Sequence, residues 1–220
     1  RTWHPIDNYD WKKVLAHLPL SEMAGAAGIS SPRLADWIDH PDYDDYWKRI
    51  AHKERYEDVE IPVMQIGGWY DTFTVGTMNN FVGMLTRGGT KLARDNQKVI
   101  IGPWVHQASE LTHAGDRDFG KDSVLDLNSE HLRWFDRWLK GMRNGVETEA
   151  PIKLFVMGSE VWRDEHEWPL ARTRFTPFHL RSGGNANSLR GDGSLDTRQP
   201  GDEPPDEYDY DPAFPVPSNG

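Results

Sequence analysis

Two short apolar segments, residues 61–66 and 98–101, constrain the fold of this chain more than any other feature of its sequence. Each is nearly continuous and ends at glycine, a pattern typical of strands buried on both faces of a parallel sheet. Apolar residues at helical spacing between residues 72 and 87 predict a helix that connects the two strands. A second helix is predicted up to residue 139, capped by Asn128 and ended by Gly141. The order strand, helix, strand, helix indicates an α/β fold.

The chain on either side of this α/β segment has a different character. Residues 1–57 are acidic and aromatic, with helical spacing and no strand signal, so they predict a helical segment. Residues 150–220 contain two strand-like runs, at 152–157 and 175–180, separated by turns rich in Gly, Asn and Ser. They predict the start of an all-β module of the sandwich type. The α/β segment itself is expected over residues 58–149.

Composition excludes several classes of partner. The formal net charge of −10 argues against nucleic acid and anionic membranes, because phosphates attract basic patches. No apolar run is long enough to span a bilayer and no secretory leader is visible, so we expect a soluble protein, cytoplasmic or secreted. The chain has no cysteine, which excludes disulfides and thiolate metal sites. The tail from residue 204 to 217 is rich in proline and acidic residues and is expected to be an extended connector to further polypeptide.

A carboxylate and an imidazole follow the two predicted strands. Asp71 comes just after the first strand and His106 just after the second. In open α/β sheets ligands bind beyond the carboxyl ends of the strands, so side chains there are well placed for catalysis. An acid followed by a histidine on the next strand's loop matches the order of the last two triad members in α/β-hydrolases. The alternative is that Asp71 is a turn residue and His106 a surface or core histidine.

The motifs around these two residues resemble those of a known family. Residues 68–73 (GWYDTF) and 101–106 (IGPWVH) resemble the two late motifs of the cocaine esterase and X-prolyl dipeptidyl-peptidase (CocE/NonD) serine hydrolases. In that family the Asp of the first motif is the triad acid and the His of the second is the triad base. The resemblance therefore assigns these roles to Asp71 and His106.

The resemblance covers most of the chain, in the family's order. The further matching segments are residues 40–47, at the return of the family's helical cap, 134–141, in its last core helix, and 155–158, 162–163 and 168–169, at the opening of its jelly roll. It implies a partial α/β-hydrolase core with a helical cap segment before it and the start of a β jelly-roll sandwich after it. The chain is thus expected to be the C-terminal part of such an enzyme.

The resemblance implies an acyl-enzyme mechanism that cleaves an ester or amide bond. The family's nucleophile lies on a Gly-x-Ser-x-Gly elbow before the cap, and no serine here has that setting. The nucleophile and the oxyanion donors are therefore expected outside these 220 residues, and the chain alone is expected to be inactive. The expected partners are a small ester or amide substrate and the remaining part of the same enzyme. Carboxylesterase, dipeptidyl-peptidase and β-lactam acylase activities all remain open.

Four aromatic residues beside the predicted pair are candidates for the substrate pocket: Trp69, Tyr70, Phe73 and Trp104. Packing beneath the loops is an equal alternative for each of them. No metal or organic cofactor is expected. His113, Asp116 and Asp118 lie in a charged, glycine-containing segment that is better explained as a surface loop than as a metal site.

A different class of function also fits the sequence. The chain is alternatively a non-catalytic binding or structural module built around the β-sandwich domain, which the missing nucleophile supports. The sequence leaves open whether the protein forms a homo-oligomer.

Overall fold

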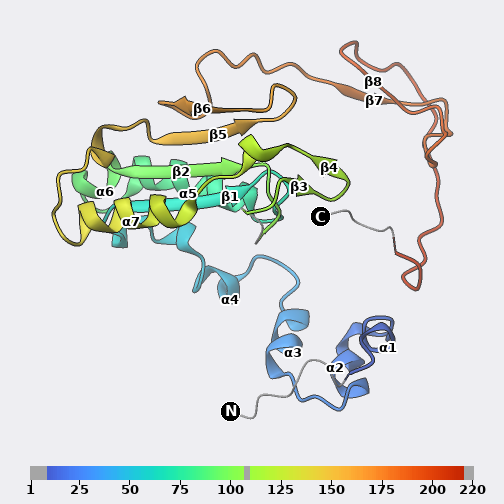
Figure 1. Ribbon diagram of the computed structural model, residues 1–220. Helices are drawn as coiled ribbons and strands as arrows, with labels where there is room; N and C mark the ends of the chain where they lie inside the picture. Colours follow the sequence, from blue (N-terminus) through green and yellow to red (C-terminus); the bar gives the residue numbers. More distant parts are fainter. Residues whose placement is uncertain (1–8, 107–109, 216–220) are drawn as a thin grey trace. The chain divides into compact units, whose positions relative to one another are not determined.

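The computed structural model describes residues 9–106 and 110–215 (Figure 1). The chain divides into two compact units, Arg1–Glu54 and Arg55–Gly220. The predicted segments 1–57 and 150–220 each include residues outside the described ranges, at 1–8 and 216–220.

The described part of the first unit is built from short helices and turns. Its elements are α1 (Trp11–Leu15), α2 (Met23–Ala26), α3 (Pro32–Asp39), α4 (Asp45–Lys48) and the 3-10 helices Leu20–Glu22 and His52–Glu54. Two of these helices are capped by an aspartate side chain, α1 by Asp10 and α4 by Asp44. At α1, Asp10 accepts from the Lys13 N–H at 3.2 Å. The helical spacing of the sequence is thus observed as helices in these residues.

A polar and aromatic cluster fixes the start of α4. Asp44 Oδ1 accepts from the Tyr46 N–H at 2.9 Å, and Oδ2 of the same carboxylate lies 2.5 Å from His40 Nδ1. The His40 ring stacks on Tyr46, and the Trp47 indole donates to the His40 carbonyl at 2.7 Å. The hydrogen bond from His40 and those from the backbone hold the pKa of Asp44 below its ordinary value despite the opposing effect of burial. Asp44 therefore caps α4, and His40 holds the Asp44 carboxylate in place.

The second unit contains a four-stranded sheet in the order β1-β2-β5-β6. Its strands are β1 (Val63–Gly68), β2 (Gln97–Gly102), β5 (Ile152–Val156) and β6 (Val161–Glu165). The first three are parallel and β6 is antiparallel to β5. The remaining elements are α5 (Thr74–Arg87), α6 (Lys91–Asp95), α7 (Leu127–Trp138), the hairpins β3 (His113–Ala114) with β4 (Arg117–Asp118) and β7 (His179–Arg181) with β8 (Ser194–Asp196), and the 3-10 helices Tyr56–Asp58, Lys121–Ser123 and Val146–Thr148.

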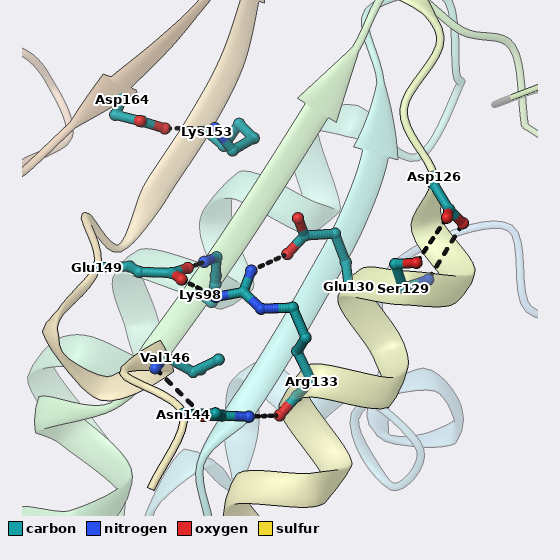
Figure 2. A network of polar contacts seen from close by, with 10 residues as sticks. All are labelled: Lys98, Asp126, Ser129, Glu130, Arg133, Asn144, Val146, Glu149, Lys153 and Asp164. Atoms are coloured by element: carbon teal, nitrogen blue, oxygen red, sulfur yellow. Dashed lines mark hydrogen bonds and ion pairs between the residues drawn. The ribbon is translucent and has the colours of Figure 1, made fainter.

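Helices cover both faces of the sheet, with α5 and α6 on one face and α7 on the other (Figures 1 and 2). Every residue of β2 is buried, as its apolar sequence predicts. Val99 and Ile101 point from β2 into a core formed with Phe81 of α5, and all three side chains are fully buried. The residues of β1 between Val63 and Ile66 are only partly buried, because β1 is an end strand of the observed sheet.

The structure corrects the expected place of one strand. The run 152–157 was expected to open an all-β module, but β5 lies parallel to β2, with Val99 opposite Ile152 and Ile101 opposite Leu154. Ile152 and Leu154 are buried in the same core as α5. The apolar side chains of this run therefore extend the α/β sheet instead of starting a separate layer.

Smaller differences concern where elements begin. The side chain of Asp126, not Asn128, caps α7, accepting from the Ser129 N–H at 3.1 Å. The strand expected at 175–180 is observed as β7, three residues long and paired with β8. The β3–β4 hairpin and α6 were not predicted, because each is too short to show a periodic pattern.

Candidate active site

The two loops that carry the predicted pair lie side by side because β1 and β2 end in register, with Gly68 opposite Gly102. Beyond that point the backbone pairing continues: the Trp69 N–H donates to the Gly102 carbonyl at 2.9 Å and the Tyr70 N–H to the Trp104 carbonyl at 3.1 Å. A Cβ on Gly68 would lie 2.0 Å from the Trp104 carbonyl oxygen, so only glycine fits there. The glycines that end the strands therefore allow the loops to approach closely.

Asp71 is held by the turn that leads into α5. Its N–H donates to the Gly68 carbonyl at 3.0 Å, and its carbonyl accepts from Thr74 Oγ1 at 2.7 Å. The Phe73 N–H donates to Asp71 Oδ1 at 2.9 Å. The carboxylate is thus fixed from its own loop, with its side chain only 7% exposed.

His106 faces this carboxylate from the next loop. Its Nδ1 lies 3.0 Å from Asp71 Oδ2, which is hydrogen-bond distance. The imidazole packs edge-to-face against the Phe73 ring, with the ring centroids 5.1 Å apart. The His106 side chain is 61% exposed. The structure therefore brings the two predicted residues together, one buried and one open to solvent.

The environment of Asp71 favours its ionised form. Burial raises the pKa of the carboxyl, but the hydrogen bonds from the Phe73 backbone and from His106, together with the charge of His106, outweigh that effect. The net result is a pKa of Asp71 below its ordinary value. A carboxylate that stays ionised at neutral pH can orient an imidazole and stabilise its charged form.

The four predicted pocket residues have different surroundings. Phe73 is 62% exposed and Tyr70 is 36% exposed, so both present ring surface to solvent. Trp104 is 3% exposed, and Trp69 packs against the main core while its indole donates to the Phe155 carbonyl at 2.7 Å. The burial of Trp104 and the core packing of the partly buried Trp69 favour the packing alternative for both.

Residues that were not predicted to belong to the site support these loops. Phe119, from the segment after β4, lies 5.7 Å from the Tyr70 ring, and Trp162 of β6 lies 5.6 Å from the Trp104 ring. Phe155 of β5 contacts both Phe119 and Trp162. No local pattern marks these contacts, because they join segments that are distant in the sequence.

The described residues form no group of three or more His, Asp or Glu side chains arranged to hold a metal ion. His113 and Asp118 face each other across the β3–β4 hairpin, and Asp118 Oδ1 accepts from the Gly120 N–H at 2.9 Å. Across residues 9–106 and 110–215, no helix is both long and apolar enough to cross a bilayer.

A cavity of about 730 Å³ lies along β7 and β8 and is lined by residues such as Leu180, Leu195 and Pro204. Neither Asp71 nor His106 lines this cavity. We give the pair more weight as a candidate site than the cavity, because catalysis needs convergent titratable groups and not volume alone.

Two family models match the chain. Residues 4–108 match X-Pro dipeptidyl-peptidase (S15 family), and residues 144–216 match the X-Pro dipeptidyl-peptidase C-terminal non-catalytic domain. Cocaine esterase from Rhodococcus sp. (strain MB1 Bresler) is 36% identical over 98% of this chain. The chain spans 38% of the length of that relative.

Solved structures show a similar fold. An aminopeptidase from a marine sediment Thaumarchaeota archaeon superposes with a TM-score of 0.72 at 19% identity, covering 99% of this chain and 34% of that one. An α-amino acid ester hydrolase superposes with a TM-score of 0.70 at 22% identity, covering 95% of this chain and 34% of that one. At these identities the likeness shows the α/β fold alone.

Proposed function

The chain belongs to the X-Pro dipeptidyl-peptidase (S15) and cocaine esterase family of hydrolases, and we propose that it supplies two members of a serine-hydrolase triad. Asp71 is the acid and His106 the base. The nucleophilic serine comes from polypeptide outside these 220 residues, consistent with the 38% of cocaine esterase that the chain spans.

The observation that carries the proposal is a buried carboxylate paired with an exposed imidazole. Asp71 Oδ2 and His106 Nδ1 are 3.0 Å apart, and the side chains are 7% and 61% exposed. A general base needs one ring nitrogen held by the acid and the other free to reach the hydroxyl. A surface histidine without function has no need of an oriented, buried partner.

The proposed reaction transfers an acyl group from an ester or amide to water. His106 Nε2 takes the proton of the serine hydroxyl as its oxygen attacks the substrate carbonyl, and gives that proton to the leaving alcohol or amine. A water molecule then loses a proton to His106 and attacks the acyl-enzyme carbonyl, and His106 returns that proton to the serine oxygen as the acid is released. Asp71 remains ionised throughout, in keeping with its lowered pKa.

The finer assignments belong to the same proposal. Residues 1–57 form a segment of a helical cap, residues 58–149 the C-terminal part of the hydrolase core, and residues 150–220 the start of the jelly-roll domain, whose first hairpin, β5–β6, is added to the core sheet. Phe73 and Tyr70 contact the acyl part of the substrate with their exposed rings, and Trp69 and Trp104 support them from beneath.

Substitution of the pair in the complete enzyme tests the proposal. His106→Gln and Asp71→Asn are each expected to lower kcat for a 4-nitrophenyl ester by about 10⁴-fold, because the base is lost or held in the wrong tautomer. His113→Gln, an exposed histidine on β3, is the matched control and should leave turnover unchanged. Full turnover in His106→Gln would mean that the base lies elsewhere.

The substrate class is tested on the same protein. Covalent labelling by a fluorophosphonate is expected, because this reagent reports an activated serine. A panel of a 4-nitrophenyl ester, an X-Pro dipeptide amide and a β-lactam with an acyl side chain then ranks the three open activities by kcat/KM. An intact complete protein that reacts with none of these reagents would favour the non-catalytic alternative.

A further inference from the structure

We infer that the β5–β6 hairpin is a positioning element for the proposed catalytic pair and acts on it through Phe155 and Trp162. Both residues lie in the part of the chain that matches a domain described as non-catalytic. This positioning role rests on the proposed function of Asp71 and His106. In this role the hairpin holds the catalytic loops in place and does not contact the substrate.

The β5 strand holds the loop that carries the acid. Trp69, two residues before Asp71, donates its indole N–H to the Phe155 carbonyl at 2.7 Å. Phe155 is fully buried, so this carbonyl is a fixed acceptor. The Trp69 side chain cannot move without breaking a hydrogen bond in an interior site, where an unpaired donor is unfavourable.

The β6 strand holds the loop that carries the base. Trp162 packs against Trp104, two residues before His106, with the ring centroids 5.6 Å apart. Trp162 is itself fixed, because its indole donates to the Asp122 carbonyl at 3.0 Å and its ring packs edge-to-face on Phe155. The hairpin therefore contacts both catalytic loops through side chains that cannot easily rotate.

A third contact closes the arrangement. Phe119 is 3% exposed and lies between the Tyr70 ring, at 5.7 Å, and the Phe155 ring, at 6.1 Å. Tyr70 directly precedes Asp71. The aromatic groups of four separate segments thus meet beside the pair, and Phe155 and Trp162 form the side of this cluster that the hairpin contributes.

The position of the loop that carries His106 therefore depends on the contact between Trp104 and Trp162. Backbone hydrogen bonds fix the loops where they leave β1 and β2, but the Trp104 indole beyond that point packs against Trp162. Loss of the Trp162 ring would leave a space into which Trp104 and the following residues can relax. A displacement of about 1 Å in a catalytic group can lower a rate by about 100-fold.

Trp162→Leu in the complete enzyme is the main test. We expect kcat for a 4-nitrophenyl ester to fall by about 10- to 100-fold with KM changed by less than about twofold, because alignment and not binding is lost. The downfield proton resonance of the His106 imidazole, identified by its absence in His106→Gln, is expected to shift or broaden. Trp162→Phe keeps an aromatic ring and should retain kcat within about threefold. The matched control is Val161→Thr, on the neighbouring exposed position of β6, which should change neither quantity.

A second variant covers the case in which Trp162→Leu does not fold. Trp69→Phe removes the N–H that binds the Phe155 carbonyl, together with one ring of the indole, and kcat is expected to fall by about three- to tenfold. Unchanged kcat and an unchanged imidazole resonance in the folded variants would overturn the positioning role, as would equal losses in Trp162→Leu and Trp162→Phe. Full activity in His106→Gln would instead overturn the proposed function, so the two failures are distinguishable.

Discussion

Replacing Glu149 by glutamine is expected to destabilise the fold by about 3 kcal/mol, because it removes the counter-charge of a buried lysine. Lys98 lies on β2 with its side chain 5% exposed, and its Nζ contacts the Glu149 carboxylate (Figure 2). Removing one partner of a buried pair costs about 3–5 kcal/mol, and the lower end applies because the Glu149 side chain is 33% exposed. The contact of Glu149 with Arg133, whose side chain is 39% exposed, adds less than about 1 kcal/mol.

Urea and thermal unfolding at pH 7 measure this effect. For a chain of this size, 3 kcal/mol corresponds to a fall in Tm of about 6–12 °C. The matched control is Asp164→Asn, which breaks the ion pair with Lys153. The Asp164 side chain is 60% exposed, so the loss should cost less than about 1 kcal/mol. Replacing both partners of the pair, in Lys98→Met with Glu149→Leu, should restore most of the stability. A Glu149→Gln protein within about 0.5 kcal/mol of the wild type would refute the reasoning.

The pH dependence of the difference gives an independent check. Burial raises the pKa of Glu149, but hydrogen bonds and charge from Lys98 and Arg133 outweigh it, so the pKa in the folded protein lies below the ordinary value of 4.5. A carboxyl with a depressed folded-state pKa stabilises the fold above its unfolded-state pKa and loses that contribution as pH falls. The stability gap between wild type and Glu149→Gln should therefore be complete above about pH 5 and narrow at lower pH.

Three further substitutions test the fold around the site. Gly68→Ala is expected to lower the free energy of unfolding by more than about 2 kcal/mol, because its Cβ would lie 2.0 Å from the Trp104 carbonyl; a circular-dichroism melt equal to wild type would contradict the close approach. Phe81→Ala, at a fully buried position of α5, should cost about 3–5 kcal/mol in urea unfolding, and a loss below 1 kcal/mol would place this side chain outside the core. Tyr56→Phe removes the hydroxyl that donates to Asn80 Oδ1 at 2.8 Å and should cost about 1 kcal/mol in urea unfolding. An unchanged free energy of unfolding would mean that water replaces this hydrogen bond without loss.

The sequence predicts the parts of the fold that carry their own pattern. The runs that became β1 and β2, the helix α5 between them, and the meeting of Asp71 with His106 all follow from periodicity and from the direction of parallel strands. The position of β5 does not follow in this way. A short apolar run after a helix reads the same whether it joins the existing sheet or opens a new layer, and only pairing with β2 decides between them.

The surroundings of the candidate site were predicted less well than the pair itself. An aromatic residue beside a catalytic loop has the same local sequence whether it faces a substrate or the core, so Trp104 and Phe73 could not be separated before the structure was known. Their exposed fractions, 3% and 62%, depend on Phe119, Trp162 and other residues contributed by distant segments. Long-range packing therefore determines which aromatic groups remain available to a ligand.

The proposed catalytic pair is ordered by contacts within the described residues alone. Asp71 and His106 are set by the register of two adjacent strands and by hydrogen bonds within their own loops, and none of these contacts needs the nucleophile. The β5–β6 hairpin then adds side-chain contacts from the C-terminal side. In the proposed enzyme, further polypeptide would have to bring only the serine and the oxyanion donors to the exposed face of His106. Catalytic geometry in the complete enzyme would then depend on how well that polypeptide docks, which makes kcat more sensitive than KM to changes at the contact between the two parts.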